Sequence, residues 1–156
     1  MSWETGRARI HELVEAGELG QVTPDQDLAQ RMLGDAQRHL ATAAVAESTG
    51  DLSGAYQLAY DALRKSAASL LEAQGLRPTS RGGHIAVQDA VIAQFGTTIR
   101  ALRSFSRLRR ARNSFEYPNA EIPGPSGDDV KDAIRVAGEV NDAASKILDS
   151  GILPRW

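Results

Sequence analysis

Signals that start and stop α-helices recur along this chain at intervals suited to long helices, and no segment shows the alternation typical of a β-strand. Thr23 stands before a proline and three residues before Gln26, which predicts a capping box and a long helix that ends at Gly50. Asp51 is expected to cap a second helix, which ends at Gly75. Because the connection between them is only about two residues long, the two helices are predicted to form an antiparallel hairpin.

Four further helices are predicted from the same signals, together with two loops rich in proline and glycine. The helices cover 3–16, 84–95, 97–117 and 127 to about 149, and the loops cover 76–83 and 119–127. Ser126 and Asp129 form a capping pattern before the last helix. The sequence thus predicts an all-α fold that forms a single domain overall. It consists of an antiparallel helical bundle of about five helices over 23–156, preceded by an N-terminal helix and a flexible linker over 1–22.

Scarce residue types exclude several classes of site. The 156 residues contain no cysteine, which excludes disulfide scaffolds, thiolate zinc sites, iron–sulfur clusters and cysteine nucleophiles. No two of the three histidines, His11, His39 and His84, have the spacing of a metal-binding pair on a helix. We therefore expect neither a bound metal nor a cofactor.

Membrane and secretion signals are also missing from the sequence. No stretch approaches the roughly 18 apolar residues of a membrane-spanning helix. Near the N-terminus, Glu4, Arg7 and Arg9 stand where a secretion signal would have an apolar run. The expectation is a cytoplasmic protein without membrane contact.

The formal net charge of −2 conceals a strong internal asymmetry. Between Arg64 and Arg112 there are ten basic residues and only two acidic ones, Glu72 and Asp89, so this middle part carries a charge of +8. The rest of the chain then carries −10. A local excess of positive charge favours a polyanion or an acidic protein surface as the partner.

The strongest local signal is the predicted helix over 97–117, which carries six arginines and no acidic residue before Glu116. On a helical wheel, four of them form one stripe, called the arginine stripe below: Arg100, Arg103, Arg107 and Arg110. A second polar strip consists of Arg109, Arg112, Asn113 and Glu116. Because guanidinium groups stay charged and bind phosphate oxygens through paired hydrogen bonds, the two strips predict a phosphate-binding surface. The alternative is a solvated face whose charges pair with acidic parts of the protein, as the spacing of Arg112 and Glu116 allows.

Five segments follow one another in a recognisable order. They are AYQLAYDALRK at 55–65, Leu70-Leu71, Gly75-Leu76, Gly83-His84 and LRRARNSFEYP at 108–118. This succession resembles the HEPN domain, a family named for nucleotide binding in higher eukaryotes and prokaryotes, and the resemblance covers roughly 25–149. It implies a helical bundle, in agreement with the predicted helices. It also implies a homodimer in which two copies of an Arg-x(4–6)-His motif meet in one cleft and cleave RNA without a metal ion.

Arg112 matches the arginine of this motif and Asn113 the polar residue that often follows it, but Tyr117 stands where the family has a histidine. Cleavage through the 2′-hydroxyl of RNA needs a group that takes a proton and one that supplies a proton, and imidazole suits both near neutral pH. Tyrosine, with an ordinary pKa of about 10, is a poor base. Three alternatives remain: Tyr117 as an acid or a phosphate-positioning group, His84 supplied by the neighbouring helix, or Glu116 as the base.

Two functions follow from the resemblance. The first is a metal-independent endoribonuclease, a toxin or defence effector, which acts on RNA as a homodimer and binds the RNA backbone with its arginine stripe. The alternative is a non-catalytic nucleotide- or RNA-binding module that partners a nucleotidyltransferase antitoxin, with Tyr117 as a nucleotide-contacting or modified residue. A bundle that only retains the fold is the third interpretation. Whether the chain is an enzyme stays open, because no histidine follows His84 in the sequence.

Overall fold

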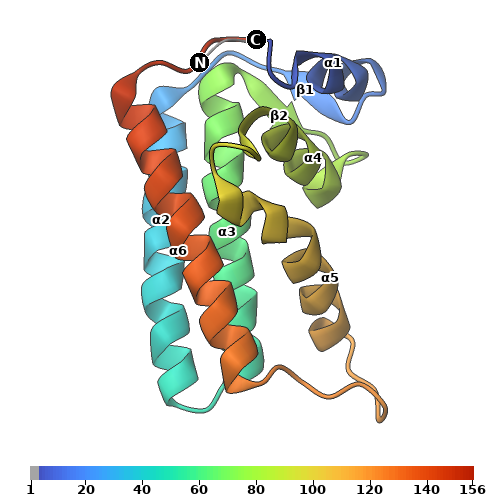
Figure 1. Ribbon diagram of the computed structural model, residues 1–156, viewed down its shortest axis with the longest axis vertical. Coiled ribbons are helices and arrows are strands. Elements are labelled where there is room, and N and C mark those ends of the chain that lie inside the picture. Colours follow the sequence, from blue (N-terminus) through green and yellow to red (C-terminus); the bar gives the residue numbers. More distant parts are fainter. Residues whose placement is uncertain (1–3) are drawn as a thin grey trace.

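Three long helices lie side by side along most of the length of the molecule, and a group of shorter elements packs beside them (Figure 1). The computed structural model describes residues 4–156. Its elements are α1 (Arg7–Glu15), β1 (Leu19–Gln21), α2 (Gln26–Ser48), α3 (Leu52–Gln74), β2 (Leu76–Pro78), α4 (Gly83–Phe95), the 3-10 helix η1 (Arg100–Ser104), α5 (Phe105–Glu116) and α6 (Gly127–Ser150). The long helices are α2, α3 and α6. The predicted all-α fold is confirmed, with the addition of one short two-stranded sheet.

Side-chain caps set where the long helices begin. Asp51 caps α3 and Ser126 forms a capping box with Asp129 on α6, both as predicted. The predicted capping box at Thr23 is wrong, because Asp25 caps α2 by accepting a hydrogen bond from a backbone N–H of the first turn. A carboxylate at this position also interacts favourably with the positive end of the helix dipole, which explains why α2 begins two residues later than expected.

Helix α3 is the centre of the fold. It packs against α2 and α6 and also against α4 and α5, and its many alanines allow these neighbours to approach closely. One buried polar group links the three long helices: the side chain of Asn141 on α6 donates hydrogen bonds to the carbonyl oxygen of Leu33 and to the hydroxyl of Ser66. Since a buried amide is costly without partners, this network favours a single alignment of the three helices.

A two-stranded antiparallel sheet lies where the sequence predicted a flexible linker and a loop. Strand β1 pairs with β2 in a register that places Leu19 opposite Pro78 and Gln21 opposite Leu76. Both leucines are buried in the core, and the pairing satisfies the backbone groups of the two segments. The prediction that the chain has no strand is therefore wrong. Three residues are too few to show an alternating pattern, so the sequence carried no signal for it.

The arginine-rich segment, predicted as one continuous helix, forms two helices in the structure. The 3-10 helix η1 ends at Ser104, and α5 begins at Phe105. Ile99, Leu102 and Phe105 are all buried, at the three-residue spacing that a 3-10 turn places on one side. Two threonines and Ile99 precede η1, and such β-branched residues disfavour the start of an α-helix. The arginine stripe therefore follows a bent path.

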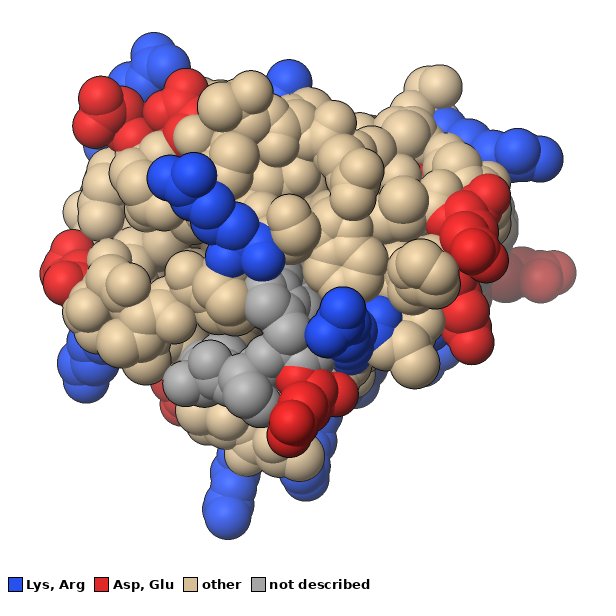
Figure 2. Space-filling view, turned by 90° about the horizontal axis from the view of Figure 1, so that it is seen from above, with Lys and Arg blue, Asp and Glu red and all other residues tan. Residues whose placement is uncertain are grey.

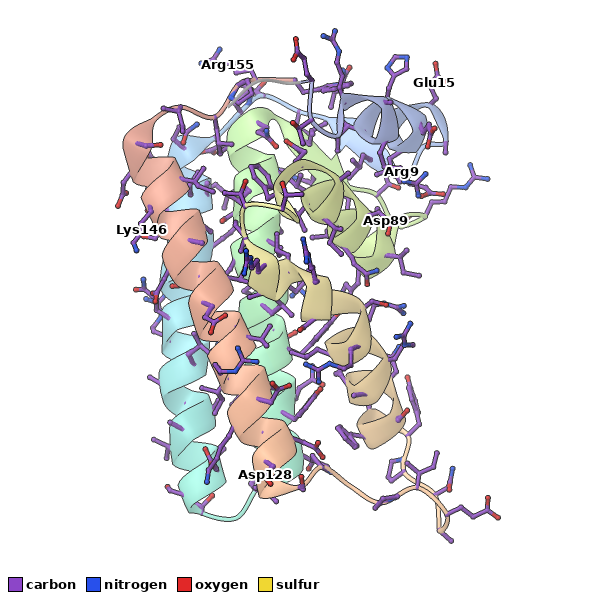
Figure 3. All side chains as sticks on the ribbon, in the orientation of Figure 1. Arg9, Glu15, Asp89, Asp128, Lys146 and Arg155 are labelled. Atoms are coloured by element: carbon purple, nitrogen blue, oxygen red, sulfur yellow. The ribbon has the colours of Figure 1, made fainter. Side chains whose placement is uncertain are left out.

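Helix α1 packs against α4, at the end of the molecule where both termini lie (Figure 1). Ile10 and Leu13 of α1 are buried in the same core as the long helices. Arg9 reaches across to Asp89 of α4 and forms an ion pair of 2.8 Å (Figure 3). Trp3, the first residue of the helix predicted over 3–16, lies outside the described residues.

The end that carries the termini shows no patch of a single charge in the view from above. Uncharged residues cover most of this face, and charged side chains of both signs are scattered over it and along its edge (Figure 2). No helix within residues 4–156 combines the length and the apolar character needed to cross a bilayer. The six arginines of the predicted phosphate-binding surface lie on η1 and α5.

Candidate functional site

A tyrosine of α3 and a histidine of α4 form a close pair beside the core, called the ring pair below. Tyr60 is fully buried, and its hydroxyl oxygen lies 3.0 Å from Nδ1 of His84. The two ring centroids are 5.7 Å apart. Phe105 of α5 packs edge-on against Tyr60, with 6.1 Å between the centroids. The core thus holds Tyr60 in place, and Tyr60 in turn positions the half-buried His84 ring.

Arg112 of α5 is held in one position by several partners. Its guanidinium carbon lies 5.6 Å from the centroid of the Tyr60 ring, within the range of a cation–π interaction. Its Nε donates to Oε1 of Gln57 at 2.9 Å. Its Nη1 donates to Oδ1 of Asn113 at 3.2 Å and lies 2.7 Å from Oε2 of Glu116, so the ion pair expected from their spacing is present. The Arg112 side chain keeps 20% of its surface exposed, which leaves part of the guanidinium accessible to a ligand.

Two more arginines act on the ring pair but have fewer partners. Arg109 of α5 donates from Nε to Oε1 of Gln88 on α4 at 3.1 Å. Arg64 lies one helical turn after Tyr60 on α3, and its ion pair with Asp61 is loose, at 3.8 Å. Its Nε is enclosed by protein and has no hydrogen-bond acceptor. A buried donor without an acceptor is unfavourable, so the environment of Arg64 is incomplete.

Burial and positive charge determine the protonation of the ring pair. Burial raises the pKa of Tyr60 to about 12, although the nearby arginines act in the opposite direction. Burial also lowers the pKa of His84, and the charges of Arg64 and Arg112 lower it further. His84 is therefore neutral at neutral pH. When its proton is on Nδ1, the ring donates a hydrogen bond to the Tyr60 oxygen and Nε2 is able to accept a proton.

A pocket of about 370 Å³ opens beside Arg112 between α3 and α5. Its walls include Tyr56 and Gln57 from α3 and Arg112, Phe115 and Glu116 from α5. Tyr56 and Phe115 pack edge to face, with their centroids 4.9 Å apart. Aromatic surface next to a guanidinium group is the combination with which proteins hold an unstacked RNA base and its phosphate.

The catalytic residues predicted from the sequence lie at different distances from this group. Asn113 and Glu116 contact Arg112 directly, and His84 is linked to Arg112 through Tyr60. Tyr117, by contrast, is 74% exposed, and its side chain has no partner among residues 4–156. The structure therefore brings four of the five predicted residues together and leaves Tyr117 outside. Within the same described residues, no three His, Asp or Glu side chains gather as ligands for a metal ion.

The four residues of the arginine stripe have different environments. Arg107 forms an ion pair of 2.8 Å with Asp132 of α6. Arg103 donates from Nε to a backbone carbonyl at 3.2 Å, and Arg110 donates to a serine hydroxyl of the preceding turn at 3.1 Å. Arg100 is exposed and has no side-chain partner among the described residues. Three of the four guanidinium groups thus lack a carboxylate partner, and Arg107 is paired with α6.

Gln57, Arg64 and Gln88 belong to this group but were not predicted from the sequence. Gln57, Tyr60 and Arg64 are separated by three and four residues, which places them on one face of α3, and Gln88 follows His84 by four. That spacing is the signal that could have identified them. The spacing alone does not identify a site, because tyrosines on a buried helix are more often packing residues.

The model of the HEPN domain family matches residues 29–148, which include the whole group around Arg112. The chain belongs to the HEPN family. The resemblance found in the sequence is thereby confirmed over most of the chain. No curated protein and no solved structure matches it.

Membership of the HEPN family connects the chain with nucleotides or RNA, and the charge of its site agrees with such a ligand. In this HEPN domain, Arg112 and Asn113 lie on α5, and the Arg112 guanidinium lies over the ring of Tyr60, whose hydroxyl contacts His84. Helix α1 and strand β1 precede the matched segment.

Proposed function

We propose that this HEPN protein is a metal-independent endoribonuclease, which acts on cytoplasmic RNA as a homodimer in the role of a toxin or defence effector. One observation carries the proposal: an imidazole is available although Tyr117 replaces the histidine of the motif. The hydroxyl oxygen of Tyr60 lies 3.0 Å from Nδ1 of His84, and the guanidinium of Arg112 lies over the Tyr60 ring. Tyr60 thus contacts both the imidazole and the motif arginine. His84 is neutral because burial lowers its pKa, and a neutral imidazole can take a proton.

The reaction uses groups that are present at the site. His84 takes the proton of the 2′-hydroxyl while the 2′-oxygen forms a bond to phosphorus and the bond from phosphorus to the 5′-oxygen breaks. The protonated His84 then gives this proton to the departing 5′-oxygen. The products are a 2′,3′-cyclic phosphate and a 5′-hydroxyl. Arg109 and Arg112 stabilise the negative charge that develops on the phosphoryl oxygens.

The other residues of the site have supporting roles in this proposal. Asn113 and Glu116 fix the guanidinium of Arg112 through a hydrogen bond and an ion pair. Tyr117, which extends into solvent, contacts the RNA or the second protomer. The RNA backbone is bound along η1 and α5 by the arginine stripe, that is by Arg100, Arg103, Arg107 and Arg110.

Incubation of the purified protein with total cellular RNA in EDTA tests this function. The wild type is expected to produce discrete fragments, and Arg112→Ala and His84→Asn should each lower the rate by roughly 100-fold or more. Arg38→Ala is the matched control, because it removes a highly exposed arginine from α2, and it should cleave at the rate of the wild type. Circular dichroism and gel filtration verify that each variant is folded and dimeric. Intact RNA after incubation with the folded wild type would overturn the proposal.

A second function, an accessory module that partners a nucleotidyltransferase antitoxin, is favoured by the exposure of Tyr117. At 74% exposed and just beyond the end of α5, its hydroxyl is open to a modifying enzyme. Co-expression with a nucleotidyltransferase would then add the mass of one AMP group to Tyr117, and Tyr117→Phe would abolish the addition. An unchanged mass together with cleavage of RNA would exclude this alternative in favour of the first.

A further inference from the structure

The positive charges around the ring pair are not balanced by the carboxylates near them. Arg112 has Glu116 at 2.7 Å. Among residues 4–156, the one side-chain partner of Arg109 is a neutral glutamine, and that of Arg64 is Asp61 at the long distance of 3.8 Å. The neutral His84 neither adds to this positive charge nor offsets it. The group as a whole therefore carries a net positive charge, which favours the binding of an anion.

Arg64 is the member of this group whose environment is least complete. It follows Tyr60 by four residues and Gln57 by seven on α3, so it lies on the face that holds Arg112. Its Nε is enclosed and has no acceptor, while 27% of its side chain surface is exposed. A ligand oxygen that reaches the exposed part of the guanidinium from solvent would form a charge-assisted hydrogen bond there.

We propose that Arg64, Arg109 and Arg112 form a subsite for a phosphate monoester within each protomer. A monoester is close to a dianion at neutral pH, whereas a phosphodiester of the RNA backbone carries one negative charge. Two guanidinium groups without a close carboxylate match the dianion better. The inference rests on the proposed function only in sharing Arg112, and it extends that function by assigning the ligand class: a mononucleotide or the phosphorylated 5′ end of an RNA.

Titration calorimetry with AMP and with adenosine measures how much the phosphate monoester contributes to binding, because the two ligands differ only in the phosphate. AMP is expected to bind at least ~10-fold more tightly than adenosine. Arg64→Gln should reduce this preference to roughly 2-fold or less, and Arg64→Lys, which keeps the charge but loses the fork of N–H groups, should give an intermediate value. Lys65→Gln is the matched control: it removes a charge from the next residue of α3, but Lys65 contacts His39 of α2, so the AMP preference should be unchanged.

Oligoribonucleotides identify the source of the monoester. A 2′-O-methyl RNA with a 5′-phosphate is compared with the same RNA carrying a 5′-hydroxyl, since neither can be cleaved through the 2′-oxygen. A preference for the phosphorylated strand supports the subsite and assigns it to RNA ends. A preference seen only with AMP supports the subsite and assigns it to mononucleotides.

The result that would overturn the inference is equal binding of AMP and adenosine, or an AMP preference that folded Arg64→Gln retains. The cleavage assay on RNA with a 5′-hydroxyl separates this inference from the proposed function. Loss of the AMP preference in an Arg64→Gln protein that still cleaves supports both. An AMP preference in a wild type that cleaves no RNA supports the subsite and overturns only the nuclease.

Discussion

Tyr60 explains how a single buried side chain can hold an imidazole near an arginine that lies far away in the sequence. Its ring is packed by Phe105, its hydroxyl contacts His84, and Arg112 lies over its face. Removing the hydroxyl alone separates the two roles of this residue. Packing and the cation–π contact belong to the ring, and only the hydrogen bond to His84 belongs to the oxygen.

Tyr60→Phe is therefore expected to lower RNA cleavage by about 10-fold while changing the free energy of unfolding by only ~1 kcal/mol. Tyr56→Phe is the matched control for the free energy of unfolding, because Tyr56 is also buried on α3 and its hydroxyl has no hydrogen-bond partner among residues 4–156. Cleavage rates and urea denaturation of the two variants test this expectation. Equal rates for Tyr60→Phe and the wild type would show that the hydroxyl does not position His84 for the reaction.

The pKa of His84 gives a second test at the residue scale. Burial, followed by the charges of Arg64 and Arg112, lowers this pKa below its ordinary value of 6.5. Arg64→Gln should raise the pKa of His84 towards 6.5. NMR titration of the His84 ring protons in both proteins measures this change. Between the lowered pKa and 6.5 the unfolded chain binds more protons than the folded one, so stability should fall as pH decreases through this window. A pKa of His84 that is the same in both proteins would contradict the role given to Arg64.

At the scale of the elements, the connection between α3 and β2 depends on Gly75. This residue has a φ of 84° in the left-handed region, and a Cβ at this position would lie 2.7 Å from the carbonyl oxygen of Val22. Gly50, after α2, has a similar φ of 86°, but a Cβ there would meet no atom within 4 Å. The two glycines thus share the backbone conformation and differ in the space around them.

Gly50→Ala is expected to cost about 1 kcal/mol of stability, the strain of alanine in the left-handed region. Gly75→Ala should cost at least ~1–2 kcal/mol more, because the alpha carbon would also have to move away from the segment that leads into α2. Urea denaturation of both variants measures the difference. Equal losses would show that the chain around Val22 gives way without cost.

The elements that could be predicted are those that carry their own signals. Helices α3 and α6 begin at the predicted caps, and Gly75 and Gly151 end them in the left-handed conformation. The sheet and η1 could not be predicted, since each is formed by burial of a few side chains against distant parts of the chain. Leu19 and Leu76 are an example: they lie on paired strands that are far apart in the sequence.

The candidate site could be predicted only in part for the same reason. Arg112, Asn113 and Glu116 lie within one turn or two of α5, so a motif and a helical wheel are enough to group them. Gln57, which holds Arg112, comes 55 residues earlier in the chain. Only the packing of α5 on α3 brings the two together, and one sequence does not show that packing.

At the scale of the whole molecule, the structure joins the segment before the HEPN bundle to the helix that carries His84. Helix α1 packs on α4, where Ile10 and Leu13 enter the common core and Arg9 pairs with Asp89. The C-terminus reaches the same end, where the ring of Trp156 lies 6.3 Å from that of His11 on α1. The backbone N–H of Trp156 also donates to the carbonyl oxygen of Gln74 at the end of α3, so this tryptophan reports on the end of the bundle where α1 packs.

We expect α1 and the bundle to unfold in one cooperative transition, because they share a core. In a Trp3→Phe background, Trp156 is the one remaining tryptophan of the two in the chain, so its fluorescence follows the α1 end while far-UV circular dichroism follows all helices. The two urea midpoints should coincide. Leu13→Ala, which removes a buried side chain of α1, should lower both midpoints together, with a loss of about 2–5 kcal/mol. A fluorescence midpoint at lower urea than the dichroism midpoint would mean that α1 detaches first, and then the position of His84 would not depend on it.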